Sequence, residues 1–155
     1  EALPEAIPQL IEGLSAAPVQ AFKIGSSAHG LLRPDKIVAY CATFEALAEA
    51  GAALEDHLSG CPAQGVPFTA SISHSGLLSW GTDPPSLHPA SKNPDRESWR
   101  LWVTNQLAAA LVEARAGEPG ESAAQFALER LRLQGVEIET WTPRQGIWHE
   151  GQGMP

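Results

Sequence analysis

Three cations near the start of the chain are the residues whose types and spacing best suit chemistry. Lys23 lies between Phe22 and Ile24, and Arg33 and Lys36 follow soon after. In a chain with 10 lysines and arginines against 18 aspartates and glutamates, this grouping predicts a pocket for an anion such as phosphate. A lysine held partly out of water gives up its proton more easily, so Lys23 can be a general base. The alternative is that Lys23 points into solvent from an edge strand.

Two further residues extend this candidate site. His29 stands in a loop of small residues just past Lys23, and histidine titrates near neutrality, which suits an acid that protonates a leaving group. Arg100 falls in the first turns of a long predicted helix, where a cation is unfavourable unless an anion offsets it. We expect Arg100 to join the anion site through the tertiary fold.

The charge balance argues against a polyanion as the general partner. The 155 residues carry a formal net charge of -8, so the chain lacks the long-range attraction that nucleic-acid and anionic-membrane binding need. No apolar run is long enough to span a membrane, and the first residues lack the pattern of a signal peptide. We expect neither a nucleic acid nor a membrane as partner.

Known cofactor and metal signatures are missing from the sequence. We find no glycine-rich phosphate loop, dinucleotide fingerprint, nucleophile elbow or HExxH motif. Cys41 and Cys61 are not spaced as zinc ligands, and each lies in an apolar context where a reduced thiol packs as a small hydrophobic group. We therefore expect no cofactor, no metal and a cytoplasmic location.

Hydrophobic spacing predicts the elements that position these residues. Helices are expected over residues 4–16, 43–60, 95–116 and 122–134, and strands over 19–24, 36–41, 65–72, 76–81 and 136–141. Thr43 is the expected cap of the second helix, and Gly60 marks its end. Loops are expected over 25–35 and 82–94. This order predicts an α+β fold with a mixed or antiparallel sheet and packed helices, in a single domain over 1–142 with a flexible tail over 143–155.

The order of several short segments resembles a known family. The segments are AFKI, RPDKIVAY, GVPFT, GLLSWG, ESWRLWVTNQLAAAL and FALERLRLQGVEIETW, and they cover roughly residues 7–142. Their order is similar to that of the HopA-type bacterial effector family. More distantly, it resembles the lyase domain of lanthionine synthetases and the phosphothreonine lyase effectors.

The resemblance implies an elimination that removes phosphate from a phosphorylated serine or threonine in a peptide and leaves a dehydroamino acid. Such a site needs a base for the α-proton, an acid for the leaving phosphate and cations for the departing oxygens. The resemblance implies Lys23 as the base and matches Tyr40 to a tyrosine that closes the next strand. It also implies that Arg33, Lys36 and Arg100 hold phosphate.

One feature of these lyases is missing from the chain. They carry a Lys-x-His strand whose histidine is the acid, whereas Gly25 stands two residues beyond Lys23 here. Three alternatives stay open: the strand lies in an N-terminal part outside this chain, His29 replaces the histidine, or the domain does not catalyse.

Two functions from different classes follow. The first is a phosphopeptide lyase that acts in the maturation of a ribosomally made, lanthipeptide-type peptide, beside a separate kinase. The second is a non-catalytic module that binds a peptide or partner protein through a cleft lined by Lys23 and Arg33, as a partner subunit of a modifying enzyme. A host-directed effector is a third hypothesis, which the lack of a secretion segment weakens.

Overall fold

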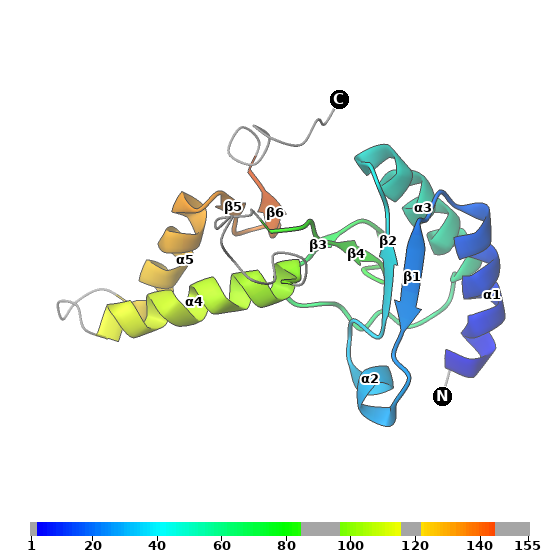
Figure 1. Ribbon diagram of the computed structural model, residues 1–155, viewed down its shortest axis with the longest axis horizontal. Coiled ribbons are helices and arrows are strands. Elements are labelled where there is room, and N and C mark those ends of the chain that lie inside the picture. The colour runs from blue at the N-terminus through cyan, green and yellow to red at the C-terminus, as the bar shows by residue number, and fades with distance from the viewer. Residues whose placement is uncertain (1–2, 85–96, 116–121, 145–155) are drawn as a thin grey trace. The chain divides into compact units, whose positions relative to one another are not determined.

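The computed structural model describes residues 3–84, 97–115 and 122–144, and Figure 1 shows their helices and strands. The helices are α1 (Leu3–Ala16), α2 (Ala28–Leu32), α3 (Phe44–His57), α4 (Trp99–Arg115) and α5 (Ala123–Leu133). The strands are β1 (Ala21–Ile24), β2 (Ile37–Tyr40), β3 (Ala70–Ser71), β4 (Ser79–Trp80), β5 (Val136–Glu137) and β6 (Thr142–Pro143). The strands pair as β1 with β2, β3 with β4 and β5 with β6. The predicted α+β class is confirmed.

The contacts between residues divide the chain into two units. Among the described residues, the N-terminal unit comprises 3–66 and 71–79, and the C-terminal unit comprises 67–70, 80–84, 97–115 and 122–144. The domain expected over 1–142 and the tail expected over 143–155 stay predictions. Each unit is described below by itself.

Two helices of the N-terminal unit bury leucines against each other. Leu10 and Leu14 recur at helical spacing in α1, and Leu54 and Leu58 lie at the end of α3. All four are buried, with at most 8% of their surface exposed. Strands β1 and β2 pack against this aliphatic core.

Helix α3 begins where the sequence predicts, and it ends at His57, three residues before the predicted Gly60. Thr43 has extended backbone, and its Oγ1 accepts a hydrogen bond of 3.2 Å from the Ala46 N–H. After the cap residue Leu58, Gly60 takes a φ of +86°, a conformation that glycine adopts without the steric penalty of a side chain. The cap and the glycine therefore fix the two ends of the helix.

The β1–β2 pair covers this core with one of its faces. The strands are antiparallel, in the register Ala21↔Tyr40, Phe22↔Ala39, Lys23↔Val38 and Ile24↔Ile37. Ile24, Ile37 and Ala39 pack against the leucine core. Because side chains alternate across a strand, Lys23 and Tyr40 lie on the opposite face.

The C-terminal unit has an aromatic core instead. Its buried residues come from α4, α5 and the start of β5, and they are Trp99, Trp102, Val103, Leu131 and Val136. Trp99 and Trp102 stack with ring centroids 5.6 Å apart and planes inclined at 25°. The predicted inward position of Trp99 is confirmed, since 4% of its surface is exposed.

Two half-buried aromatic residues close this core with unusual backbone geometry. Phe68 and Trp141 meet edge to face, with centroids 5.0 Å apart, and both pack on the buried cluster. Their φ angles are +61° and +59°, in the left-handed region that bulky residues rarely adopt. Such a conformation costs on the order of 1 kcal/mol per residue, which the aromatic packing must offset.

The prediction of a single strand over 136–141 is wrong. Val136 and Glu137 form β5, and the chain then turns back to β6, with the Trp141 N–H bonded to the Glu137 carbonyl at 2.7 Å. The turn still lets Val136 and Ile138 reach the core. The apolar–acidic alternation therefore marks which side chains are buried, and the chain needs no continuous strand to bury them.

Three other element predictions need correction. The strands expected over 65–72 and 76–81 reduce to the two-residue strands β3 and β4. Between them, the buried Ser73 hydroxyl accepts the Leu78 N–H at 2.9 Å and so replaces backbone pairing. The loop expected over 25–35 contains α2, because the Ser27 hydroxyl caps it by accepting the Gly30 N–H at 3.2 Å.

The helix expected from residue 95 begins at Trp99 in the described part of the chain. Ser98 precedes it and accepts the Leu101 N–H at 3.3 Å through its hydroxyl. Most of the loop expected over 82–94, and of the tail expected over 143–155, lies outside the described residues. Among the described helices, none combines the length and the apolar character needed to cross a membrane.

Candidate functional site

The outer face of the β1–β2 pair, formed by Ala21, Lys23, Val38 and Tyr40, carries two of the predicted site residues. Lys23 and Tyr40 are both exposed, and they lie diagonally across the pair because Lys23 faces Val38. The Lys23 Nζ lies 5.4 Å from the centroid of the Tyr40 ring, within cation–π range. An exposed contact of this kind is worth on the order of 0.5 kcal/mol. The strand pair therefore places an amine and a phenol together, with the amine in contact with solvent.

Lys36 lies just before β2 and belongs to the same end of the site. Its backbone carbonyl accepts the Gly25 N–H at 2.8 Å, so the register places residue 36 on the side of the sheet that carries Lys23. The Lys36 Nζ donates a hydrogen bond to the Gln64 side-chain oxygen. Among the described residues, neither Lys23 nor Lys36 forms an ion pair with a carboxylate.

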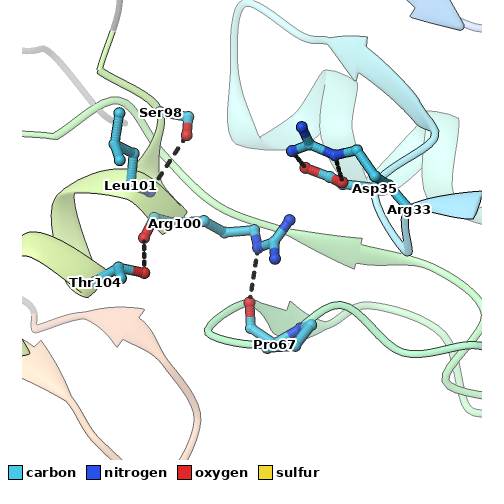
Figure 2. Close-up of polar contacts among 7 residues, drawn as sticks. All are labelled: Arg33, Asp35, Pro67, Ser98, Arg100, Leu101 and Thr104. Carbon is cyan, nitrogen blue, oxygen red and sulfur yellow. Dashed lines mark hydrogen bonds and ion pairs between the residues drawn. The ribbon is translucent and has the colours of Figure 1, made fainter. Parts of the chain in front are cut away.

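Arg33, by contrast, is compensated by a neighbouring acid. Its Nε and Nη2 donate to the two carboxylate oxygens of Asp35 at 2.8 and 2.7 Å, the fork geometry drawn in Figure 2. Asp35 raises the pKa of the Arg33 guanidinium, first through these hydrogen bonds and then through its charge. Arg33 follows α2 directly and stays largely exposed. A phosphate at this position would have to compete with Asp35 for the guanidinium.

His29 lies in the short helix α2 and is exposed. It follows β1 and precedes Arg33 in the chain, so it is a residue of the N-terminal unit, like Lys23 and Tyr40. Its role as an acid stays a prediction.

Arg100 is part of the C-terminal unit. Its Nε donates to the Pro67 carbonyl at 3.1 Å, and its own carbonyl accepts the Thr104 hydroxyl at 2.7 Å, as Figure 2 shows. Arg100 therefore ties the first turns of α4 to the backbone that leads into Phe68. Its predicted contribution to a phosphate site stays a prediction.

The free edge of β1 is a feature that sequence reasoning missed. Gly25 and Lys36 form a hydrogen-bonded pair, so Lys23 and Val38 form the next such pair along the ladder. Phe22 and Ile24 alternate with these pairs, and their N–H and C=O groups point away from β2. We call these four backbone groups the β1 edge. Among the described residues, no hydrogen bond reaches them.

Two of the three side chains along this edge, those of Phe22 and Lys23, are exposed to solvent. Phe22 is 46% exposed, although it shares a face with Ile24, which packs on the leucine core. Lys23 between them is exposed. The alternation of Phe22, Lys23 and Ile24 in the sequence indicated the two faces, but it carried no signal for which edge of the strand would stay unpaired.

A shallow pocket of about 220 Å³ also lies in the N-terminal unit. Its lining consists of Glu55, Leu58, Ser59, Gly60, Cys61, Ser75 and Leu77. The Glu55 carboxylate accepts the His74 N–H at 3.1 Å. The lining has an acid, no base and none of the predicted site residues, so it does not suit phosphate. In the described part of the chain, no group of three or more His, Cys, Asp and Glu residues could hold a metal ion.

Comparisons of the chain with models of protein families, with curated proteins and with solved structures found no match. The resemblance to the HopA-type family therefore stays a prediction.

Proposed function

We propose that the N-terminal unit is a peptide-binding module that accepts an extended segment as a third strand along the β1 edge. The observation that carries this proposal is the row of N–H and C=O groups at Phe22 and Ile24, which no hydrogen bond from the described part of the chain reaches. An added strand pairs with such groups through its own backbone, which is a recurring mode of peptide recognition.

The exposed aromatic side chain at the same place supports the proposal. Phe22 is 46% exposed, and a bound strand would place side chains directly beside it. Burying a large aromatic ring is among the strongest contributions to binding at protein interfaces. The backbone would therefore supply the pairing, and Phe22 would supply the apolar contact.

The arrangement of the cations favours binding over elimination. A lyase needs several cations free to hold a phosphate dianion, whereas the Arg33 guanidinium is engaged by the Asp35 carboxylate. Lys23 is exposed, so its amine lies in contact with water and not in an enclosed site from which water is excluded. A binding module requires neither feature.

Phe22→Pro tests the β1 edge directly. Proline has no N–H, but the Phe22 N–H faces away from β2, so the ladder between the strands is kept. We expect Phe22→Pro to bind a blocked hexapeptide that alternates threonine and valine about fivefold more weakly than Phe22→Ala, the cost of one hydrogen bond of about 1 kcal/mol. The measurement is an NMR titration of labelled protein.

Ala39→Pro is the matched control. Ala39 faces Phe22 across the pair, so its N–H points outward from the opposite edge of the same sheet. Binding should be unchanged in this variant while the β1–β2 amide signals persist in both proline variants. Equal binding by Phe22→Pro and Phe22→Ala, or no binding by the unmodified protein, would overturn the proposal.

Phosphopeptide elimination is the second candidate, and the shared face of Lys23 and Tyr40 favours it. In that reaction an amine takes the α-proton, the carbon–oxygen bond to phosphate breaks, and an acid protonates the departing phosphate. Incubation with a phosphothreonine peptide should then give a product lighter by one phosphoric acid. Lys23→Ala and Tyr40→Phe should each abolish the product, whereas a binding module gives none with any variant.

A further inference from the structure

We infer that the segment bound at the β1 edge alternates acidic and apolar residues, with its acidic side chains on the face that carries Lys23. This inference rests on the proposed function and adds the chemical class of the partner. It follows from the two faces that a third strand would extend.

The register decides which protein side chains each residue of the segment would meet. In a third strand beside β1, successive side chains point to opposite faces of the sheet. Residues on the outer face lie next to Lys23, and residues on the inner face lie next to Phe22 and Ile24. The segment therefore meets a cation and an apolar surface at alternate positions.

The charges of the outer face select acidic side chains. Among the described residues, the Lys23 Nζ contacts the Tyr40 ring and no carboxylate. Lys36 donates to the neutral amide of Gln64 and, within the described residues, pairs with no carboxylate. Lys23 and Lys36 therefore give this face a positive charge, although the net charge of the chain is -8.

Lys23 is expected to contribute more than Lys36. A third strand lies about 4.8 Å from β1, and β2 lies a similar distance beyond, so Lys36 is on the order of 10 Å from the segment. That distance is about one Debye length at physiological salt, and the contribution of Lys36 is strongly screened. Lys23 is therefore the nearer of the two cations to the segment.

The inner face selects apolar side chains. Ile24 already packs on the leucine core, while Phe22 keeps 46% of its surface exposed. An apolar residue of the segment beside Phe22 would extend the core over that ring. A polar residue there would lose hydration and gain no partner among these side chains.

Three blocked hexapeptides of equal length test the inference. They alternate valine with glutamate, glutamine or lysine, so their apolar residues are the same and only the charge differs. At low salt we expect the glutamate peptide to bind about fivefold more tightly than the glutamine peptide and the lysine peptide to bind most weakly. Raising the salt to 0.5 M should bring the three affinities close together.

Lys23→Gln should remove most of the preference for glutamate. Arg130→Gln is the matched control, because it deletes one positive charge in the C-terminal unit, where Arg130 pairs with Glu113 at 3.1 Å. The preference should persist in that variant.

The outcomes separate the inference from the proposed function. Equal binding of the glutamate and glutamine peptides, with Phe22→Pro still weakening both, would overturn the inference alone. The same result follows if Lys23→Gln keeps the full preference. Absence of binding by all three peptides would overturn the proposed function as well.

Discussion

The two units of the chain bury different side chains and leave different surfaces open. The N-terminal unit places leucines of α1 and α3 under one face of a four-residue strand pair, and the other face of that pair stays exposed. The C-terminal unit packs stacked tryptophans with residues of α5 and β5, and its β5–β6 pair has two residues per strand.

This difference indicates which unit can bind a partner through its backbone. A two-stranded sheet is marginally stable alone, so β1 and β2 depend on the leucine core beneath them. The same pair offers an edge for a further strand, since no hydrogen bond within the described residues reaches the N–H and C=O groups of Phe22 and Ile24 that point away from β2. β1 has four residues and carries Lys23, and a short edge strand with a lysine is one way in which proteins limit unspecific strand pairing. The three predictions below test this contrast, from the largest expected effect to the smallest.

Trp102→Ala should cause the largest loss. Trp102 is 3% exposed and stacks on Trp99, so its removal leaves a large cavity in the aromatic core. We expect the free energy of unfolding of the C-terminal unit to fall by about 3–5 kcal/mol, measured by denaturant titration.

Leu101→Ala is the control for that variant. Leu101 is the adjacent residue of α4 and is 50% exposed, so its truncation should change stability by about 0.5 kcal/mol or less. If Trp102→Ala also removed the amide signals of β1 and β2, the two cores would not unfold separately. That result would contradict the contrast between the two units.

Gly25→Ala should give the next largest effect, and it should act in the N-terminal unit. A Cβ at residue 25 would lie 2.6 Å from the Gly30 carbonyl carbon, and backbone cannot move aside as a flexible side chain can. We expect a loss of about 1–3 kcal/mol and a shift of α2 against the end of β1, measured by denaturant titration and amide chemical shifts.

The exposed neighbour Ser26 provides the control for this strain. Ser26→Ala should change stability by about 0.5 kcal/mol or less. Full stability of Gly25→Ala would mean that the close approach of residues 25 and 30 does not constrain this part of the unit.

Cys41 should give the smallest effect, and it depends on pH. Burial raises the pKa of the Cys41 thiol above its ordinary value of 9.0, because the thiolate is poorly solvated there. The folded state then holds the proton more tightly than the unfolded state, so this contribution to stability is present below pH 9 and is lost as the pH rises through the folded pKa. The unmodified protein should lose more stability than Cys41→Ala between pH 8 and about pH 10, and equal slopes would contradict this.

The sequence predicted the helices better than the strands. The leucine spacing of α1 and α3 and the cap at Thr43 are local signals, and the structure confirms them. Strand limits depend on pairing between distant residues, so the alternation over 136–141 did not reveal the turn at Trp141. Hydrogen bonds that the Ser27 and Ser73 hydroxyls accept from nearby backbone N–H groups account for helix α2 and for the shortness of the β3–β4 pair.

The candidate site was predictable only in part, for similar reasons. The sequence placed Lys23 in a strand and put Phe22 on the other face, and both positions are observed. Asp35 lies two residues from Arg33 in the sequence, so their ion pair could have been predicted from the sequence. Which edge of β1 stays unpaired depends on the neighbours of the strand in three dimensions, and no single-residue pattern encodes it.

Hydrogen exchange at the amides of β1 tests the central claim most directly. In the free protein, the Lys23 N–H should exchange slowly because it is bonded within the ladder, while the Phe22 and Ile24 N–H groups should exchange fast. Saturation with the valine–glutamate hexapeptide should slow exchange at Phe22 and Ile24 by about tenfold or more and leave Lys23 unchanged. Exchange at Phe22 and Ile24 that is already slow in the free protein, or that the peptide does not alter, would contradict the account.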